Sequence, residues 1–531
     1  MRGNPMPALR RLRFAVLVTA ILLATLLPAT PARAATIDVT TTSDEWGTGP
    51  TECSLREAIA SANGDVALGG CPAGSGADEI RLPAGTYGFT QSGTEPINGD
   101  VAVRDLDVNG TLTIVGTGNP VIDANDLDRV FDVTSGDSLT LRGLTLTDGT
   151  AQYGGAIRVQ SGTLALVNVV VDLNGITSGS GFDKFGGGIR AQQSTVSIAG
   201  SRITNNSVTS TNPADEVTGG GIMQWGGSLV ITDSLISGNT AQDSGGGIDV
   251  VQGGTLTLTN VTLASNLALD GDGIAFRGAT GTLTNVTIAD NGYGVTGKGG
   301  GIYADPRDAG DIIALENVTF STNTGGSQSG DGGSIYVVPT ALGQVTARNT
   351  IAAHPLAGGN CGGKALSYTN GHNLEWVPGG TNSPCFSQTI DPTTVNGDPK
   401  FPINSVGNVA PPAQNGGRTP TLALLAGSAA TDQGVAVAGI TADQRGAPRP
   451  YGAAPDIGAY ERTLCRGVLV NRVGTAGGNT LTGTAGVDGM IGLGGNDVLD
   501  GRGARDGLCG GDGNDRLLGG AGDDLLDGGP G

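Results

Sequence analysis

The chain has 531 residues with a formal net charge of −20, and 95 of its residues are glycine. Aromatic residues make up only 4%, too few to fill one wide globular core, and the glycines lack the three-residue period of collagen. The negative charge argues against binding to nucleic acid or to an anionic membrane surface. A solenoid, in which each repeat packs only on its neighbours, fits this composition.

Residues 1–34 predict a signal peptide. Four arginines precede an apolar run at 14–27, and Ala32, Arg33 and Ala34 form a small-x-small cleavage site. Such a run covers only about 21 Å of helix, short of the roughly 30 Å core of a bilayer, which argues against a membrane anchor. We therefore expect export to the cell surface or the medium, with no transmembrane anchor in the mature chain.

All six cysteines lie in the exported part, which fits an oxidising compartment. Many pairings are open to six cysteines, and local spacing favours Cys53–Cys71, Cys361–Cys385 and Cys465–Cys509. The CxxC-like or Cys/His spacing that a metal site needs does not occur.

Residues 35–100 predict an N-terminal cap and the first coil of the solenoid, with its first strand and corner at DEIRLPAGTY, 78–87. The stretch CSLREAIASA at 53–62 predicts a short amphipathic helix, in which Ser54 and Glu57 make a capping box. Such a helix would cover the open first coil of a solenoid, whose edge would otherwise pair with other chains. The stretch resembles the CSLREA motif that opens many bacterial exported β-helix proteins.

Residues 101–355 contain a repeat with three markers. A Gly-x-Ile step recurs with Ile157, Ile189, Ile222, Ile248, Ile274, Ile302 and Ile335. A second marker follows each step at Asn168, Gly200, Asp233, Asn260, Asn285, Asn317 and Asn349. Six residues further on, six of the seven repeats place another asparagine: Asn174, Asn206, Asn239, Asn266, Asn291 and Asn323.

Between the markers apolar residues alternate with Thr, Ser and Asp, which is typical of strands with corners at Gly and Asn. Repeats of this length with two or three short strands indicate a parallel β-helix, whose aligned asparagines can stack from coil to coil. An antiparallel sandwich would not keep corner residues in register over seven repeats. The pattern resembles the GGxI and FxxN repeats of the polymorphic outer-membrane proteins, which are adhesins with a right-handed β-helical passenger; FSTN at 320–323 matches the second motif.

Insertions concentrate at one corner of the predicted coils, and the longest lie at 175–185 and 207–218. The insertion side of a solenoid is often its binding side, although plain surface loops are the simpler interpretation. For catalysis, the Gly-His-Gly and Arg-x-Lys strings of galacturonase-type hydrolases are absent. Asp123, Asp126 and Asp128, just before Arg129, come nearest to the calcium-and-base arrangement of a lyase, but no catalytic residue is assigned.

Residues 356–462 resemble the choice-of-anchor Q domain, which caps the C-terminal end of exported β-helices. The resemblance rests on NCGG (360–363), GHNL (371–374), NGGRTPTLALLAGSAATDQG (415–434), DQRGAPRP (443–450) and DIGAYE (456–461). Ala430 stands where isoleucine is usual. Within this segment, Asp443 and Arg445 are expected to form a structural ion pair.

Residues 463–531 carry a nine-residue repeat from Gly474 onward, of the form GGxGxDxUx. Its sixth position holds Asn479, Asp488, Asp497, Asp506, Asp515 and Asp524, and its eighth is a large apolar residue. The pattern resembles the repeats-in-toxin, or hemolysin-type, calcium-binding repeats, whereas a glycine-rich linker would keep no such register. Glycines allow backbone carbonyls to turn toward a cation, and the carboxylate supplies charge.

If each nonapeptide makes half a turn, neighbouring loops on one side are 18 residues apart. Calcium ions are then expected between Asp488 and Asp506, Asp506 and Asp524, and Asp497 and Asp515, with a weaker site between Asn479 and Asp497. Early repeats lack the second glycine, which makes their sites less complete. The expected metal-site glycines are Gly492, Gly510, Gly511, Gly513, Gly519, Gly520 and Gly522.

The predicted fold is therefore all-β: a right-handed parallel β-helix, or pectate-lyase-like solenoid, followed by a C-terminal calcium β-roll. The expected function is that of a secreted adhesin or matrix-binding protein, with calcium as cofactor and an extracellular glycan or a host or matrix protein as partner. A polysaccharide lyase or glycoside hydrolase on the same scaffold is the alternative.

Overall fold

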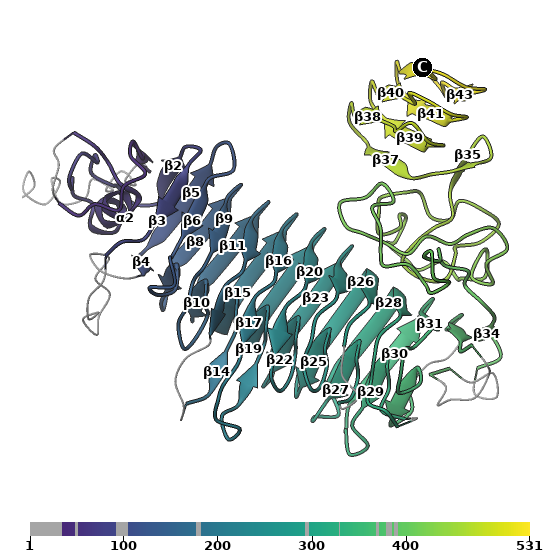
Figure 1. Cartoon of the computed structure of the whole chain (residues 1–531), viewed down its shortest axis with the longest axis horizontal. Coiled ribbons are helices and arrows are strands. Elements are labelled where there is room, and N and C mark those ends of the chain that lie inside the picture. The colour runs from purple at the N-terminus through teal and green to yellow at the C-terminus, as the bar shows by residue number, and fades with distance from the viewer. Residues whose placement is uncertain are drawn as a thin grey trace, which may run out of the picture.

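The structure is a computed structural model, and it describes residues 34–47, 51–91, 105–176, 182–292, 297–328, 330–367, 371–378, 385–386 and 391–531. The predicted signal peptide therefore lies, except for its last residue, outside the described residues. Among the helices that are described, none has the length and apolar character needed to cross a membrane. Figure 1 shows a long stack of strands, with an α-helix at its N-terminal end and a smaller stack near the C-terminus.

The long stack is a parallel β-helix, because every strand pairing within its large sheet is parallel and joins one coil to the next. Each coil contributes strands to three faces. The first face contains β4 (Leu106–Val108), β7 (Phe131–Val133), β10 (Ile157–Gln160), the start of β15 (Ile189–Ala199) and of β19 (Ile222–Thr232), β22 (Ile248–Val251), β25 (Ile274–Arg277), β27 (Ile302–Asp305), β29 (Ile335–Val337) and β32 (Cys361–Gly363).

The second face follows after a corner in each coil. It contains β1 (Thr36–Asp38), β2 (Asp78–Leu82), β5 (Thr111–Gly116), β8 (Ser138–Arg142), β11 (Thr163–Val167), the later parts of β15 and β19, β23 (Thr255–Thr259), the start of β26 (Thr280–Ala289) and of β28 (Ile312–Ser321), and β30 (Gln344–Arg348).

The third face closes each coil. It contains β3 (Thr86–Gly88), β6 (Val121–Asp123), β9 (Thr145–Thr147), β12 (Val170–Asp172), β16 (Arg202–Thr204), β20 (Leu235–Ser237), β24 (Thr262–Ala264), the ends of β26 and β28, β31 (Ile351–Ala353), β33 (Leu374–Trp376) and β34 (Val395–Asn396). β2 and β3 lie within residues 35–100, where the first coil is expected, and the ladder continues past residue 355 into β32, β33 and β34, where the Gly-x-Ile marker is absent.

The repeat markers have the predicted structural roles. All seven marker isoleucines are fully buried in the core. All seven second markers have positive φ, between 47° and 59°, which Asn, Asp and Gly tolerate better than other residues. The third-marker asparagines form a buried ladder: each Nδ2 donates to Oδ1 of the asparagine in the next coil at 2.9–3.0 Å. The predicted amide stacking is confirmed.

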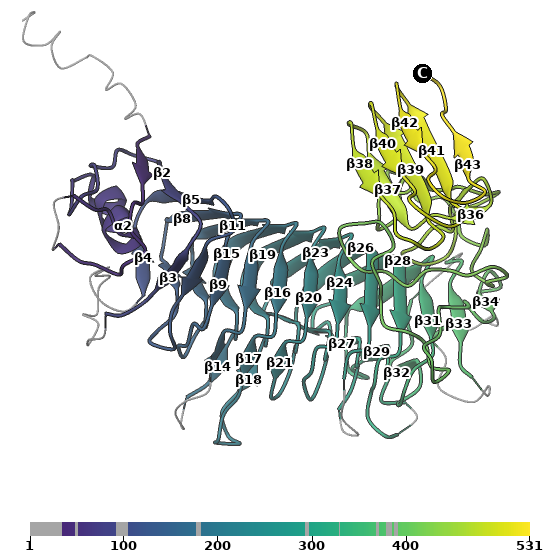
Figure 2. The same cartoon turned by 45° about the horizontal axis from the view of Figure 1, so that its top comes forward.

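The two longest predicted insertions contain short strands of their own. β13 (Gly175–Ile176), β17 (Ser207–Val208) and β21 (Thr240–Ala241) form one small parallel sheet, and β14 (Lys184–Phe185) pairs with β18 (Val217–Thr218). Figure 2 shows these strands gathered along the lower edge of the stack. In the same insertions, Lys184 and Asp215 form a buried ion pair at 3.0 Å, so the described part of this edge is ordered by its own contacts.

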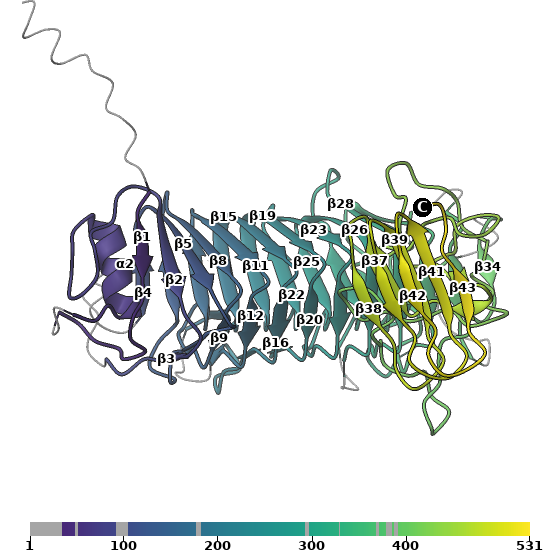
Figure 3. The ribbon, with the colours of Figure 1, turned by 90° about the horizontal axis from the view of Figure 1, so that it is seen from above.

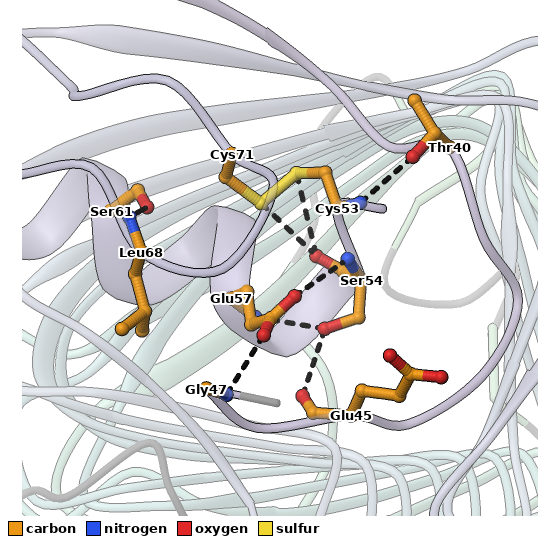
Figure 4. The surroundings of a disulfide bond; sticks show 9 residues. All are labelled: Thr40, Glu45, Gly47, Cys53, Ser54, Glu57, Ser61, Leu68 and Cys71. Atoms are coloured by element: carbon orange, nitrogen blue, oxygen red, sulfur yellow. Dashed lines mark hydrogen bonds between the residues drawn. A yellow bond between two sulfur atoms is a disulfide. The ribbon is translucent and has the colours of Figure 1, made fainter. Parts of the chain in front are cut away.

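The N-terminal cap contains α2 (Leu55–Gly64), and its capping box is formed as predicted (Figure 4). The backbone N–H of Glu57 donates to Oγ of Ser54, and the Glu57 carboxylate accepts from the Ser54 backbone at 3.2 Å and from Gly47 at 2.8 Å. The Cys53–Cys71 disulfide ties the helix start to the following loop. Cys361–Cys385 and Cys465–Cys509 are also formed, so all three pairings favoured by spacing are confirmed.

Residues 415–461 do more than cover the last coil, because they lie along the third face of the β-helix. Their contacts with the second-marker corners include Asn285 Nδ2 donating to the Ala442 carbonyl at 3.0 Å. Gln444 accepts from Thr287 at 2.7 Å and donates to Thr262 at 2.8 Å, so one side chain touches two coils. The predicted Asp443–Arg445 ion pair is confirmed at 2.8 Å. The chain itself therefore covers the third face at later coils, which include β24 and β26.

The C-terminal roll, residues 463–531, begins with an antiparallel hairpin, β35 (Leu464–Cys465) and β36 (Val468–Leu469). Two parallel sheets follow. One contains β37 (Arg472–Thr475), β39 (Gly489–Gly494), β41 (Gly507–Asp512) and β43 (Leu525–Asp527); the other contains β38 (Thr480–Thr482), β40 (Val498–Asp500) and β42 (Arg516–Leu518). Paired residues are 18 apart, as Leu481 with Leu499, which confirms that each nonapeptide makes half a turn. Met490, Leu499 and Leu508 form the apolar seam between the sheets. Seen from above, the roll lies over the last coils (Figure 3).

Candidate metal sites and a charged strand face

The sixth-position acids of the roll line up in two columns, one at each edge of the sheets. The backbone N–H of each donates to Oδ1 of the residue 18 positions later. This contact joins Asn479 to Asp497, Asp488 to Asp506, Asp497 to Asp515, and Asp506 to Asp524, at 2.6–3.0 Å. All four residue pairs expected from sequence are therefore neighbours.

Three of these carboxylates have an oxygen atom with no partner. Oδ2 of Asp497, of Asp506 and of Asp515 is buried and accepts no hydrogen bond. A buried carboxylate oxygen that no donor satisfies is costly unless a cation or a proton compensates it. Burial raises the pKa of Asp506, and the neighbouring carboxylates of Asp524 and Asp488 add to the effect.

Each unpartnered oxygen lies close to a first-position glycine, at a point where no side chain would fit. A methyl group on Gly492 would lie 2.2 Å from Oδ2 of Asp497 and 2.3 Å from the carbonyl oxygen of Gly510. A methyl group on Gly501 would lie 2.4 Å from Oδ2 of Asp506 and 2.7 Å from the carbonyl oxygen of Gly519. We call such a meeting of an unpartnered carboxylate oxygen with a carbonyl oxygen of the next loop on the same side a cradle. Gly474 and Gly483 show the same close approach, but to hydrogen-bonded oxygens of Asn479 and Asp488.

A third cradle of this kind involves residues beyond the last complete repeat. A methyl group on Gly510 would lie 2.2 Å from Oδ2 of Asp515 and 2.7 Å from the carbonyl oxygen of Gly528. The sequence prediction missed this cradle, because it counted only loops that carry an acid at the sixth position. The signal was the glycine pair that opens GGPG at 528–531.

The donor atoms of the three cradles suit calcium. They are carboxylate and carbonyl oxygens, the hard ligands that Ca²⁺ takes at roughly 2.3–2.6 Å. Of the predicted metal-site glycines, Gly492 and Gly510 open cradles, and Gly519 faces Oδ2 of Asp524 in the same way. The remaining four have left-handed backbone, at φ +107°, +125°, +97° and +140° for Gly511, Gly513, Gly520 and Gly522 respectively.

The first two repeats of the roll differ from this arrangement. Oδ2 of Asp488 accepts from the backbone N–H of Thr484 at 2.6 Å and from its hydroxyl at 2.9 Å, and Oδ1 accepts from Asn471 at 2.9 Å. Oδ1 of Asn479 accepts from the backbone N–H of Thr475 at 2.7 Å. Both carboxylate oxygens of Asp488 therefore accept hydrogen bonds from the protein, unlike Oδ2 of Asp506.

The first face of the β-helix carries a second group of acids, near its N-terminal end. Asp107 on β4 lies opposite Asp132 on β7, and Asp132 lies opposite Arg158 on β10. Arg158 forms a bidentate ion pair with Asp132. Arg129 donates to Asp105 at 2.5 Å, so two guanidinium groups balance two of the three carboxylates.

Carboxylate oxygens of Asp105, Asp107 and Asp132 all lie within 4.8 Å of one another. Burial, together with the charges of Asp105 and Asp132, raises the pKa of Asp107 to about 7. Of the acids that the sequence grouped with Arg129, Asp128 accepts from the backbone N–H of Arg129 at 2.8 Å, while the ion pair of the guanidinium is with Asp105. Asp126, which the sequence placed beside Arg129, stands exposed at a corner with φ 56°.

We predict that Asp107→Asn stabilises the protein at pH 8 relative to the wild type. The folded chain holds a proton on Asp107 that the unfolded chain releases, so wild-type stability falls as the pH rises from about 4 to about 7. The amide of the Asp107→Asn variant stays neutral at every pH. After allowance for screening, the free energy of unfolding of the variant relative to wild type is expected to be higher at pH 8 than at pH 5 by on the order of 1–2 kcal/mol. Urea unfolding at both pH values measures it. Asp126→Asn is the control, and a profile of Asp107→Asn that parallels wild type would contradict the prediction.

An aromatic group follows on the same face, beside the insertions. The ring of Phe185 stacks on Tyr153, with centroids 5.9 Å apart, and meets the edge of Trp225 at 6.2 Å. The guanidinium of Arg190 lies 4.5 Å from the centroid of the Tyr153 ring. Flat aromatic rings beside a cation are typical contact surfaces for sugars and for protein side chains. Phe182, in the adjoining insertion, is 69% exposed.

Three solved structures illustrate the similarity of the chain to known proteins. It is similar to pectate lyase Pel9A, at 14% identity, covering 81% of this chain and 97% of that chain with a TM-score of 0.40. A rhamnogalacturonan lyase follows, at 14% identity, 60% and 78% coverage and a TM-score of 0.28. The PL6 family alginate lyase AlyGC is 12% identical, and the match covers 85% of this chain and 69% of that chain with a TM-score of 0.25.

No family model and no curated protein matches the chain. At the identities and scores of the three structures, their likeness carries no argument about activity. The parallel β-helix is established by the strand register of the chain itself.

Proposed function

We propose that this protein is a secreted, calcium-binding β-helix protein that acts as a surface adhesin or matrix-binding protein. The observation that carries the calcium part is the set of three unpartnered oxygens, on Asp497, Asp506 and Asp515, each facing a cradle lined by carbonyl oxygen. Calcium sites of extracellular modules are tuned to dissociation constants of roughly 10⁻⁴–10⁻³ M, which suits an exported chain.

In this proposal the residues of the roll hold the ion and thereby hold the roll together. Asp497, Asp506 and Asp515 supply charge, and the carbonyl oxygens of Gly510, Gly519 and Gly528 supply the opposite wall. A bound calcium ion would compensate carboxylates that are otherwise buried without a partner. The apolar seam of the roll is small, so ion binding contributes directly to its folding.

The adhesive part of the proposal concerns the first face beside the insertions. Residues 415–461 contact later coils of the third face, whereas the cluster of Tyr153, Phe185, Trp225 and Arg190 lies beside the first face. Phe185 and Arg190 are buried within this cluster. Tyr153 and Trp225 are half-buried and present ring surface next to a guanidinium. The class of ligand that this surface suits is an extracellular glycan or an aromatic or acidic stretch of a host or matrix protein.

A polysaccharide lyase or glycoside hydrolase is the second candidate function. It is favoured by the group of Asp105, Asp107 and Asp132 beside Arg129 and Arg158, because a carboxyl group whose pKa is about 7 is suited to proton transfer at neutral pH. The same residues also suit a purely structural set of ion pairs, since two of the acids are held by arginines.

Two measurements test these proposals. Equilibrium dialysis against ⁴⁵Ca²⁺ is expected to show that wild type binds three more ions than the triple variant Asp497→Asn, Asp506→Asn, Asp515→Asn; equal binding by the two would contradict the calcium sites. A panel of polyuronates and neutral glycans, assayed for retention and for release of unsaturated or reducing ends, separates adhesin from enzyme. Turnover that is lost in Asp107→Asn would replace the adhesin proposal by the second candidate.

A further inference from the structure

The loops of the roll fall into two classes, according to the residue at the second position of the repeat. Threonine stands there in the first two repeats, as Thr475 and Thr484. The next four repeats have Leu493, Arg502, Gly511 and Gly520, and all four have left-handed backbone with φ between 71° and 107°. Neither threonine is among the residues with positive φ. The two classes therefore differ in backbone conformation as well as in side chain.

In the threonine class, the loop is closed by the protein itself. Thr484 gives both its backbone N–H and its hydroxyl to Oδ2 of Asp488, and the hydroxyl oxygen accepts from the N–H of Gly486 at 3.0 Å. Thr475 repeats the pattern: its backbone N–H donates to Oδ1 of Asn479, and its hydroxyl oxygen accepts from Nδ2 of the same residue at 3.0 Å. In both loops the threonine hydroxyl is therefore hydrogen-bonded to the side chain at the sixth position.

In the other class, no protein group takes that place. Oδ2 of Asp497, Asp506 and Asp515 has no partner, although the first two residues are 1% and 0% exposed. Leu493 and Arg502 also hold a left-handed conformation, which is unfavourable for an L-residue. The first-position glycine is closely approached by the same kinds of oxygen in both classes, so the classes differ in the partners of that carboxylate or amide oxygen and in the backbone at the second position.

We infer that Thr475 and Thr484 take the place of calcium in the first two loops, so that the roll has a metal-independent base and binds calcium only in its outer turns. The inference rests on the proposed calcium binding of the roll. It assigns three ions, one to each unpartnered oxygen, and none to the loops that begin at Gly474 and Gly483. The base adjoins the hairpin β35–β36, and the Cys465–Cys509 disulfide links that hairpin to β41.

The test counts bound calcium in the full chain, with the triple Asp→Asn variant as the baseline for the roll. Thr484→Gly removes the closing hydroxyl and admits the left-handed backbone of the other class, in which the N–H of residue 484 would no longer donate to Oδ2 of Asp488. This variant is expected to raise the count from three to four. Thr484→Ser keeps the hydroxyl and is the matched control, with a count of three. Arg502→Thr, at an exposed position, is expected to close the loop around Asp506 and lower the count to two.

A fourth or fifth ion in wild type, with no change in Thr484→Gly, would overturn the inference while leaving calcium binding intact. Wild type that binds no more ions than the triple variant would instead overturn the proposed function. Hydrogen exchange of wild type in chelator needs no variant: the amides of Thr475 and Thr484 are expected to stay protected while those of outer loops exchange. Equal exchange in both classes of loop would also overturn the inference.

Discussion

Removal of calcium is expected to unfold the outer turns of the C-terminal roll while the β-helix stays folded. Without the ion, Asp497, Asp506 and Asp515 each bury an oxygen that nothing compensates. At a calcium concentration ten times the dissociation constant, each site contributes about 1.4 kcal/mol, so three independent sites contribute about 4 kcal/mol. This is large relative to a seam formed by Met490, Leu499 and Leu508.

Limited proteolysis of the full chain measures this effect. In millimolar calcium the roll is expected to resist cleavage, and in excess chelator cuts are expected in its outer loops, with the β-helix intact in both. The triple variant Asp497→Asn, Asp506→Asn, Asp515→Asn should be cut at the same rate with and without calcium, which shows that the effect is local. The same cleavage pattern for wild type in both conditions would contradict the prediction, as would cleavage throughout the β-helix in chelator.

The second large effect is expected from the asparagine ladder. In Asn239→Ala, the amide that donates to the Ile203 carbonyl and to Asn266, and accepts from the backbone and side chain of Asn206, is lost. These partners remain buried without a substitute, so we expect a loss of about 3–5 kcal/mol in the free energy of unfolding. Urea unfolding of the β-helix measures the loss, with the exposed Asn109→Ala as control.

A loss below about 1 kcal/mol in Asn239→Ala would mean that the coils relax or admit water at this corner. The ladder would then be a by-product of the repeat rather than a source of its stability. The comparison with Asn109→Ala keeps the intrinsic effect of an Asn→Ala change apart from the effect of burial.

The coils could be predicted because each repeat carries its own markers. Ile157 and its equivalents point inward, and Asn168 and its equivalents turn the chain, so the local sequence sets both register and corner. The half-turn geometry of the roll was predictable for the same reason. In both stacks each repeat contacts only its neighbours, so a pattern that recurs at a fixed period predicts the local structure without knowledge of contacts to distant residues.

Other features could not be predicted, because they join residues whose spacing follows no period. Arg129 pairs with Asp105 across a coil, and nothing in the sequence near Arg129 distinguishes that acid from Asp126. The packing of Gln444 on Thr262 and Thr287 joins residues more than 150 positions apart. In the roll, the hydroxyl of Thr484 donates to the carboxylate of Asp488. The repeat pattern alone shows only that glycine is missing at this position.

The link from Cys465 to Cys509 also decides how the roll responds to a mechanical pull. A force applied to the chain beyond residue 509 passes through the sulfur atoms into the hairpin, so the segment 466–508 lies outside the path of tension. Strands β42 and β43, which follow the link, are the part that stretching can peel away. Two of the three unpartnered carboxylates, Asp497 and Asp506, lie inside the shielded segment, and only Asp515 lies on the strained side.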